Sequence, residues 1–286
     1  MWPAPRSVAA LVSLLLVACG SARPPVDGEW TVRAEATAGA VQPLGGYLLA
    51  SEDPAEGAGR GVAPEDLGGD RIALRGDADL RVGRRWGGGI EVRPTADDRL
   101  RLELDVAGPL RGRAHLDRDR RFDGERYAAG EATDADLLAR CLRVSYGRRV
   151  AALGEVGEEG QTDLVVRVGA ELLATDDAHV AGSASPEEGR QLRSGTPFLG
   201  VEARAALAPR VTFVGGLAGG AWSLDGGSRV LGDLNLGLLL GPVGPVDLHV
   251  GYGLGFRSSR KLYENHELSR VELLRHEVVV GLGVRY

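Results

Sequence analysis

The chain of 286 residues is poor in aromatic residues, lysine and cysteine. Aromatic side chains make up 5%, Lys261 is the only lysine among 34 basic residues, and there are two cysteines. Beyond the N-terminus, no stretch reaches the ~18 consecutive apolar residues that a membrane-spanning helix needs. The net charge of −6 leaves no basic surface for nucleic acid. These shortages exclude a helical membrane protein and a nucleic-acid-binding protein.

Motifs that carry chemistry are also scarce. The five histidines show no metal-ligand spacing, and no glycine run joins a strand to a helix as phosphate binding requires. Residues 117–125 have the acidic character of a calcium loop, but the ligand spacing is broken and three arginines interrupt it. His266 and Ser269 fall in a charged loop that cannot fix a hydroxyl–imidazole pair. We therefore expect no enzyme activity, no metal and no cofactor.

The N-terminus has the features of an export signal. Arg6 precedes an apolar segment at 8–18, which is too short to span a bilayer permanently. The segment ends in Leu16-Val17-Ala18-Cys19-Gly20. This run resembles the lipobox of bacterial lipoproteins; an ordinary signal peptide followed by a chance cysteine is the alternative.

The resemblance to a lipobox implies removal of residues 1–18 and lipid attachment at Cys19 by the lipoprotein-processing machinery. Residues 19–29 would then form a lipidated tether. Gly20 stands where many lipoproteins retained in the inner membrane have Asp, so the expected location is the cell outer membrane. Cys141 would have no disulfide partner.

Apolar and polar residues alternate with a period of two from residue 99 to the C-terminus. Leu100, Leu102 and Leu104 would share one face of a strand, with charged residues on the other. Helical spacing would scatter these side chains, so the pattern predicts strands. The predicted strands are 99–108, 141–153, 163–175, 197–208, 210–222, 228–241, 245–257 and 271–286.

The connections between these strands alternate in length. Residues 208–210 and 241–245 form tight turns, whereas 175–196 and 257–270 are long, polar and charged. This asymmetry resembles that of bacterial outer-membrane β-barrels. Gly281, Gly283 and the terminal Tyr286 also resemble the C-terminal signal read by the barrel-assembly machinery. By this resemblance, the other partner is the outer-membrane lipid bilayer.

We therefore predict an all-β protein: a closed antiparallel up-and-down transmembrane β-barrel with an N-terminal lipid anchor. Both termini would lie on the periplasmic side, which requires an even number of strands. The core spans 99–286, and segment 30–98 is either the start of the barrel or a small periplasmic extension. Within it, 71–82 with 86–94 forms one candidate hairpin, and 30–37 with 47–51 another. We predict ten strands, with eight or twelve as alternatives.

Alternation alone does not tell which face of the sheet points inward. A soluble lipocalin-like periplasmic lipoprotein would have the leucines inside and the charges in water. The long predicted strands and the glycine-rich polar face favour the membrane barrel. Phe198 and Trp222 fall on the polar face, so we expect bulges or strand-end positions there.

In the membrane barrel, the lumen of eight to ten strands is just filled by side chains of mixed charge, which would pair with one another. This predicts a lumen plugged by paired charges and a structural or interaction role; a narrow pore for small solutes is the alternative. The residues predicted to form the lumen charge network are Arg101, Glu103, Asp105, Arg143, Arg167, Glu171, Glu202, Arg204, Asp233, Asp247, His249, Glu277 and Arg285.

Overall fold

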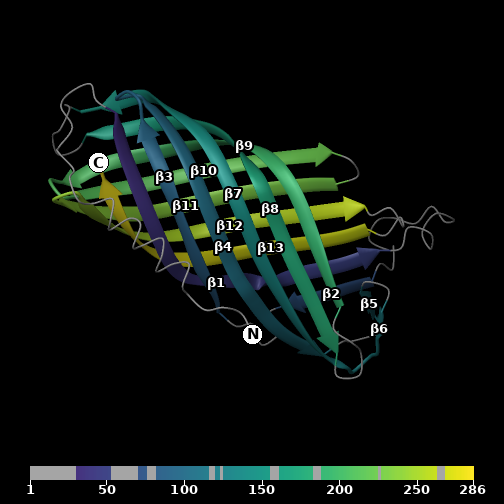
Figure 1. Ribbon diagram of the computed structural model, residues 1–286. Coiled ribbons are helices and arrows are strands. Elements are labelled where there is room, and N and C mark those ends of the chain that lie inside the picture. The colour runs from purple at the N-terminus through teal and green to yellow at the C-terminus, as the bar shows by residue number, and fades with distance from the viewer. Residues whose placement is uncertain are drawn as a thin grey trace.

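The computed structural model describes residues 30–52, 70–75, 82–115, 120–122, 125–154, 161–182, 188–224, 227–262 and 268–286. Within these ranges, no helix has the length and apolar character needed to cross a membrane. The regular structure consists of strands (Figure 1). In chain order the strands are β1 (Thr31–Glu52), β2 (Asp70–Arg75), β3 (Gly83–Arg93), β4 (Asp98–His115), β5 (Arg120–Phe122), β6 (Glu125–Tyr127), β7 (Ala132–Leu153), β8 (Thr162–Gly182), β9 (Glu188–Ala208), β10 (Val211–Leu224), β11 (Gly227–Val243), β12 (Val246–Leu262) and β13 (Leu268–Arg285).

Ten of these strands form a closed antiparallel barrel, as predicted. Their order around the ring is β1-β3-β4-β7-β8-β9-β10-β11-β12-β13, and β13 pairs with β1 to close it. The closing ladder runs from Arg33 opposite Arg285 to Glu52 opposite Leu268. Closure leaves no open sheet edge around the ring, which a barrel in lipid requires.

The start of β1 and the C-terminal residue Tyr286 lie at one end of the barrel, here called the terminal end. Val32 and Tyr286 exchange two backbone hydrogen bonds there, at 3.1 and 2.8 Å. The tight turns at Pro209–Arg210 and Gly244–Pro245 lie at the same end. Gly244 has a φ of 62°, a turn conformation that suits glycine. The opposite end is called the distal end.

The strands reach further at the distal end than the sequence predicts. Within the predicted loop 175–196, residues 175–182 continue β8 and residues 188–196 belong to β9, and each of these strands is 21 residues long. Residues 257–262 likewise extend β12, and residues 268–270 extend β13. A membrane crossing needs ~9–11 strand residues, so about half of β8 and β9 extends past it. Their polar distal parts lack the apolar alternation, because neither face there needs to meet lipid.

The N-terminal segment folds differently from the two hairpins considered above. Residues 30–37 and 47–51 belong to one strand, β1, whose pairing with β13 is irregular between Pro43 and Tyr47. β2 pairs with the distal part of β1 rather than with β3, so these two strands form no hairpin. β1 and β3 are the first two strands of the ring.

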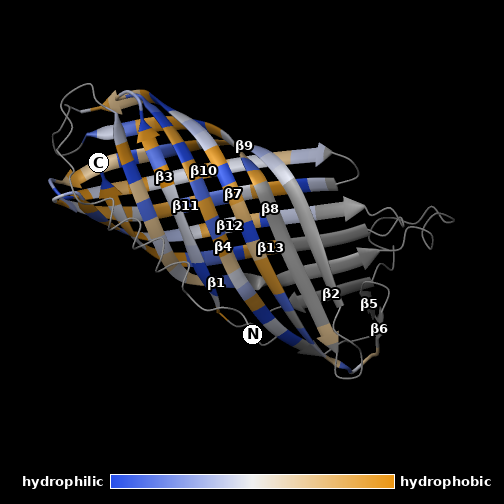
Figure 2. Cartoon of the chain, in the orientation of Figure 1, coloured by the Kyte–Doolittle hydropathy of each residue, from blue (hydrophilic) through white to orange (hydrophobic). Residues whose placement is uncertain are grey.

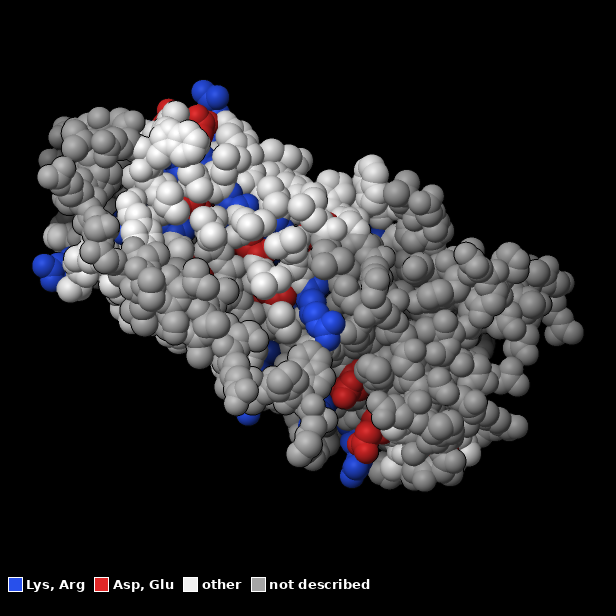
Figure 3. Space-filling model, viewed as in Figure 1, with Lys and Arg blue, Asp and Glu red and all other residues white. Residues whose placement is uncertain are grey.

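Apolar side chains cover the outside of the barrel. Leu100, Leu102 and Leu104 on β4 are 43–55% exposed, whereas Arg99, which precedes Leu100 on the same strand and points inward, is 5% exposed. Figure 2 shows the resulting alternation of orange and blue along the strands, and in Figure 3 uncharged side chains cover most of the described outer wall. This arrangement is the reverse of a soluble lipocalin-like barrel, so that alternative is wrong.

Candidate functional site

Charged side chains line the inside of the barrel, whereas Arg285 of the predicted set lies at the terminal end with its side chain 45% exposed. Among the described residues, two ion pairs join strands on opposite sides of the lumen. Arg143 on β7 donates from Nη2 to Asp233 Oδ2 on β11 at 2.9 Å. Arg204 on β9 donates from Nη2 to Glu91 Oε2 on β3 at 3.2 Å. In each pair the two strands are four positions apart in a ring of ten, so the side chains meet across the barrel. Here they are called the trans-lumen pairs.

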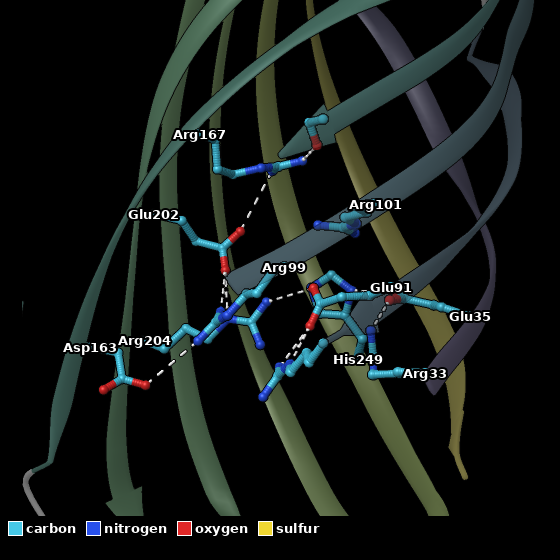
Figure 4. A network of polar contacts seen from close by, with 12 residues as sticks. Arg33, Glu35, Glu91, Arg99, Arg101, Asp163, Arg167, Glu202, Arg204 and His249 are labelled. Atoms are coloured by element: carbon cyan, nitrogen blue, oxygen red, sulfur yellow. Dashed lines mark hydrogen bonds and ion pairs between the residues drawn. The ribbon is translucent and has the colours of Figure 1, made fainter. Parts of the chain in front are cut away.

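The Arg204–Glu91 pair belongs to a larger group, which we call the proximal cluster because it lies towards the terminal end. Figure 4 shows several of its members converging in the lumen from β3, β4, β8 and β9. Arg204 Nε donates to Glu202 at 2.5 Å, and Arg167 links Glu202 to Glu103. The members are Glu91, Arg93, Asp97, Arg99, Arg101, Glu103, Arg149, Asp163, Arg167, Glu202 and Arg204.

The Arg143–Asp233 pair is the centre of a second group nearer the distal end, the distal cluster. Arg143 also donates from Nε to Glu171 at 3.1 Å, and Arg257 holds Asp233 through two bonds of 2.8 and 3.0 Å. Arg229 lies 3.9 Å from Glu171, whose side chain is fully buried. Arg143 also lies over the ring of Phe198, 5.8 Å from its centroid.

A third set of contacts spans the seam between β1 and β13, where the barrel closes. Arg33 on β1 binds Asp247 on β12 through two hydrogen bonds of 2.7 and 3.1 Å. His249 Nδ1 lies 3.0 Å from Glu35, and Arg285 donates to Asp247 at 3.0 Å. Further towards the distal end, Arg85 on β3 contacts Asp105 and Glu277, and Arg275 faces the same two carboxylates.

Inward-facing glycines make room for these charges. A Cβ on Gly253 would lie 2.7 Å from Glu277 Oε1 and 3.0 Å from Asn235 Oδ1. A Cβ on Gly283 would lie 2.6 Å from Arg33 Nη2. On the inner face of β12 and β13, the glycines therefore leave space in which charged and polar side chains from neighbouring strands pack against the backbone. A role of Gly281, Gly283 and Tyr286 in barrel assembly remains a prediction.

Sequence reasoning did not anticipate an apolar layer inside the barrel. It lies directly distal to three of the lumen charges: along the inner face, Asp105 is followed by Ala107, Arg275 by Leu273 and Asp233 by Leu231. Each of its side chains is at most 3% exposed. The layer consists of Val41, Ala107, Leu110, Leu137, Leu231 and Leu273. Part of this signal was available, because Ala107, Leu231 and Leu273 have the same parity as the predicted lumen charges of their strands, whereas Leu110 changes parity at the irregularity after Ala107.

Several lumen charges were also absent from the predicted set. They come from segment 30–98 or from within the predicted strands, and they include Arg33, Glu35, Arg85, Glu91, Arg93, Arg99, Asp163, Arg229, Arg257 and Arg275. Phe198, expected at a bulge or a strand end, instead points into the lumen and is 6% exposed. Trp222 shares the inner face with Arg229 near the distal end of β10 and is 49% exposed.

A cavity of about 180 Å³ lies between the proximal and distal clusters. Arg101, Glu103 and Glu202 line it on one side, and Arg143, Asp233 and Arg257 on the other. The small residues Gly216 and Ala218 of β10 form part of its wall, and Cys141 of β7 also lines the cavity. The charges around it are of both signs, with no ring of one sign that would select ions.

The candidate metal, hydrolase and lipid sites lie largely outside the described residues. Residues 116–119 and 123–124 of the calcium-like segment, residues 263–267 of the His/Ser segment, and the lipobox with Cys19 are not among them. In the part of the chain that is described, no three His, Cys, Asp or Glu side chains are grouped so as to hold a metal ion.

Comparisons with known proteins place the fold. No protein-family model and no curated protein sequence matches the chain. Among solved structures, it is similar to the outer membrane protease OmpT from Escherichia coli, with a TM-score of 0.51 and 10% identity, over 90% of this chain and 97% of that one. The transport unit of the E. coli autotransporter AIDA-I aligns over 99% of both chains, with 9% identity and a TM-score of 0.41. Ail of Yersinia pestis covers 91% of this chain and 100% of its own, with 9% identity and a TM-score of 0.32. The OmpT match at this identity bears on the fold alone: the chain has the fold of a bacterial outer-membrane β-barrel.

Proposed function

We propose that the protein is an outer-membrane β-barrel of a Gram-negative bacterium, anchored in addition by lipid at Cys19, with a closed lumen and a structural or interaction role. The apolar outer wall supports the membrane location, because exposed leucines and valines surround the barrel on successive strands. The terminal end would face the periplasm, since the tether that follows Cys19 leads to β1. The distal end, with its extended strands, would then project outside the cell.

The main support for a closed lumen comes from the two trans-lumen pairs. A charged side chain that pairs with its own strand neighbours leaves the centre of a barrel open. Arg143 and Arg204 instead reach carboxylates four strands away, at 2.9 and 3.2 Å. The buried apolar layer lies on the distal side of both. Solutes would have to displace two charge-assisted bonds and pass an apolar constriction, which disfavours a continuous water path.

The extended distal strands support an interaction role. β7, β8 and β9 each have 21 or 22 residues and rise past the apolar band as paired sheet. A rigid platform of this kind offers a partner a surface that costs little conformational entropy to bind. A narrow polar pore of the same shape is the second candidate, and the 180 Å³ cavity beside the small side chains of β10 favours it.

Planar-bilayer recording separates the two functions. We expect the purified wild-type barrel to give no steady single-channel steps. The variant Arg143→Ala/Arg204→Ala, which lacks both trans-lumen pairs, should give small steps or frequent openings. Arg113→Ala serves as the control, because Arg113 pairs with Asp134 where both side chains are about 60% exposed. Steady steps from the wild-type protein would refute the closed lumen and support the pore.

A further inference from the structure

Arg99 is poorly matched by its surroundings. Its side chain is 6% exposed, and its contacts to Asp163 and Glu202 are both 3.6 Å, too long for hydrogen bonds. Among the described residues, no acceptor lies within hydrogen-bonding distance of Nε or Nη1. Buried guanidinium groups nearly always have acceptors for their N–H groups, so the arrangement around Arg99 is incomplete.

The charge count of the proximal cluster points the same way. Its connected ion pairs include six arginines, namely Arg93, Arg99, Arg101, Arg149, Arg167 and Arg204. They face five carboxylates, namely Glu91, Asp97, Glu103, Asp163 and Glu202. Among these close contacts the arginines therefore outnumber the carboxylates by one, and Glu35 of the seam set acts on Arg101 from a longer distance. In a poorly hydrated lumen an uncompensated charge is costly, and a bound anion removes that cost.

A small void adjoins Arg99. Its volume is about 10 Å³, enough for one water-sized particle, and Gly147 and Val165 form part of its wall. Ser145 also lines it; the serine hydroxyl accepts from Arg167 Nη2 at 2.9 Å, which leaves its own hydrogen to be donated. A Cβ on Gly147 would lie 3.1 Å from Val165 Cγ1, so a larger side chain would crowd this space.

The carboxylates beside the void are already engaged. Glu91 accepts from Arg93 at 2.7 Å and from Arg204 at 3.2 Å, and Glu202 accepts from Arg204 at 2.5 Å. The donors beside the void that lack an acceptor among the described residues are Arg99 Nε and Nη1, and the Ser145 hydroxyl has its own hydrogen to donate. Water can fill such a space but does not offset the excess charge.

We propose that this void binds a single monoatomic anion, chloride in the cell, held by the Arg99 guanidinium and the Ser145 hydroxyl. The small volume of the void favours a monoatomic anion over polyatomic anions such as sulfate or phosphate. The anion completes the proximal cluster and holds Arg99 in place on the periplasmic side of the lumen. The proposal rests on the closed lumen proposed above, since an open, hydrated lumen would solvate Arg99 without a bound ion.

Crystals grown in bromide provide the direct test. Bromide replaces chloride and scatters anomalously, so we expect an anomalous peak between Arg99 and Ser145. No peak should occur there in crystals of Arg99→Met, which removes both the donors and the excess charge. A wild-type map without this peak, with water or no density in the void, would overturn the proposal.

Thermal unfolding in detergent provides the second readout. At constant ionic strength, replacing gluconate by chloride should raise the wild-type Tm by about 2–4 °C when chloride is ten times its Kd. This increase should be absent in Arg99→Met and retained in Arg113→Met. Ser145→Ala keeps Arg99, so it should shift the chloride dependence to severalfold higher concentration; it also serves if Arg99→Met fails to fold.

The outcomes separate this proposal from the proposed function. A chloride effect that persists in Arg99→Met, or its absence from the wild type, refutes the anion site. If that wild-type barrel is still silent in planar bilayers, the closed lumen stands and only the anion site fails. If the wild type conducts steadily, the closed lumen fails first.

Discussion

Replacing Arg143 by methionine tests whether the lumen is dry. Glu171 is fully buried and accepts from Arg143 Nε at 3.1 Å, and its other cation, Arg229, lies 3.9 Å away. Asp233 keeps both bonds to Arg257, so the loss falls mainly on Glu171. Removing the hydrogen-bonded arginine of a buried carboxylate costs up to about 3–5 kcal/mol where, as at Glu171, the remaining cations act only from a longer distance. We expect Arg143→Met to lower the free energy of unfolding by that amount.

The measurement is equilibrium unfolding in urea with the barrel in lipid vesicles, followed by tryptophan fluorescence. The double variant Arg143→Met/Glu171→Gln should recover a large part of the loss, because it leaves no unpaired charge on Glu171. Arg113→Met breaks an ion pair between side chains that are 59% and 60% exposed, and should cost less than about 1 kcal/mol. If Arg143→Met and Arg113→Met cost the same, the distal cluster is hydrated and the reasoning is refuted.

Three further predictions concern packing, access and anchoring. Gly169→Ala should cost about 1–3 kcal/mol in the same unfolding assay, because the new Cβ would lie 2.7 Å from Phe198 Cζ; Gly216→Ala should be near neutral, since the nearest atom is 3.7 Å away, and equal costs would contradict the packing argument. A membrane-impermeant maleimide should label Cys141 after heat denaturation and not in the folded barrel, whereas rapid labelling of the folded protein would show water access to the cavity. Cys19→Ala should abolish incorporation of labelled fatty acid and leave a barrel that still shows heat-modifiable migration on a gel; retained label would place the lipid elsewhere.

The inward and outward faces could be predicted from the sequence, because alternate side chains of a strand point to opposite faces and only two assignments of those faces are possible. The outer leucines of β4 and the inner charges between them follow directly from parity. Where strands end was less predictable. The polar segments of β8 and β9 at the distal end resemble loops in sequence, because strands that are paired in water need no alternation of apolar and polar residues.

The partners of the lumen charges could not be predicted at all. Parity places Arg143 and Asp233 inside, but their contact across four strands depends on the tilt and stagger of the closed barrel. A one-residue change in the register between any two strands would bring other residues together. The apolar layer escapes prediction for a different reason: period-two alternation assigns inward positions to the polar face, although Leu273 has the same parity as Arg275 and Glu277.

The seam contacts suggest why this lumen is filled with charge rather than with leucine. Strands β1 and β13 come from opposite ends of the chain and have to find one register among several that their apolar outer faces would accept equally well. Arg33 meets Asp247, 214 residues away, through two hydrogen bonds, and Arg85 meets Glu277 across the same seam. These contacts form only when the ring closes with the observed stagger, because a guanidinium and a carboxylate displaced by one strand residue no longer align. Paired charges in the lumen therefore stabilise one closed register over its neighbours, a selectivity that apolar side chains of similar volume would lack.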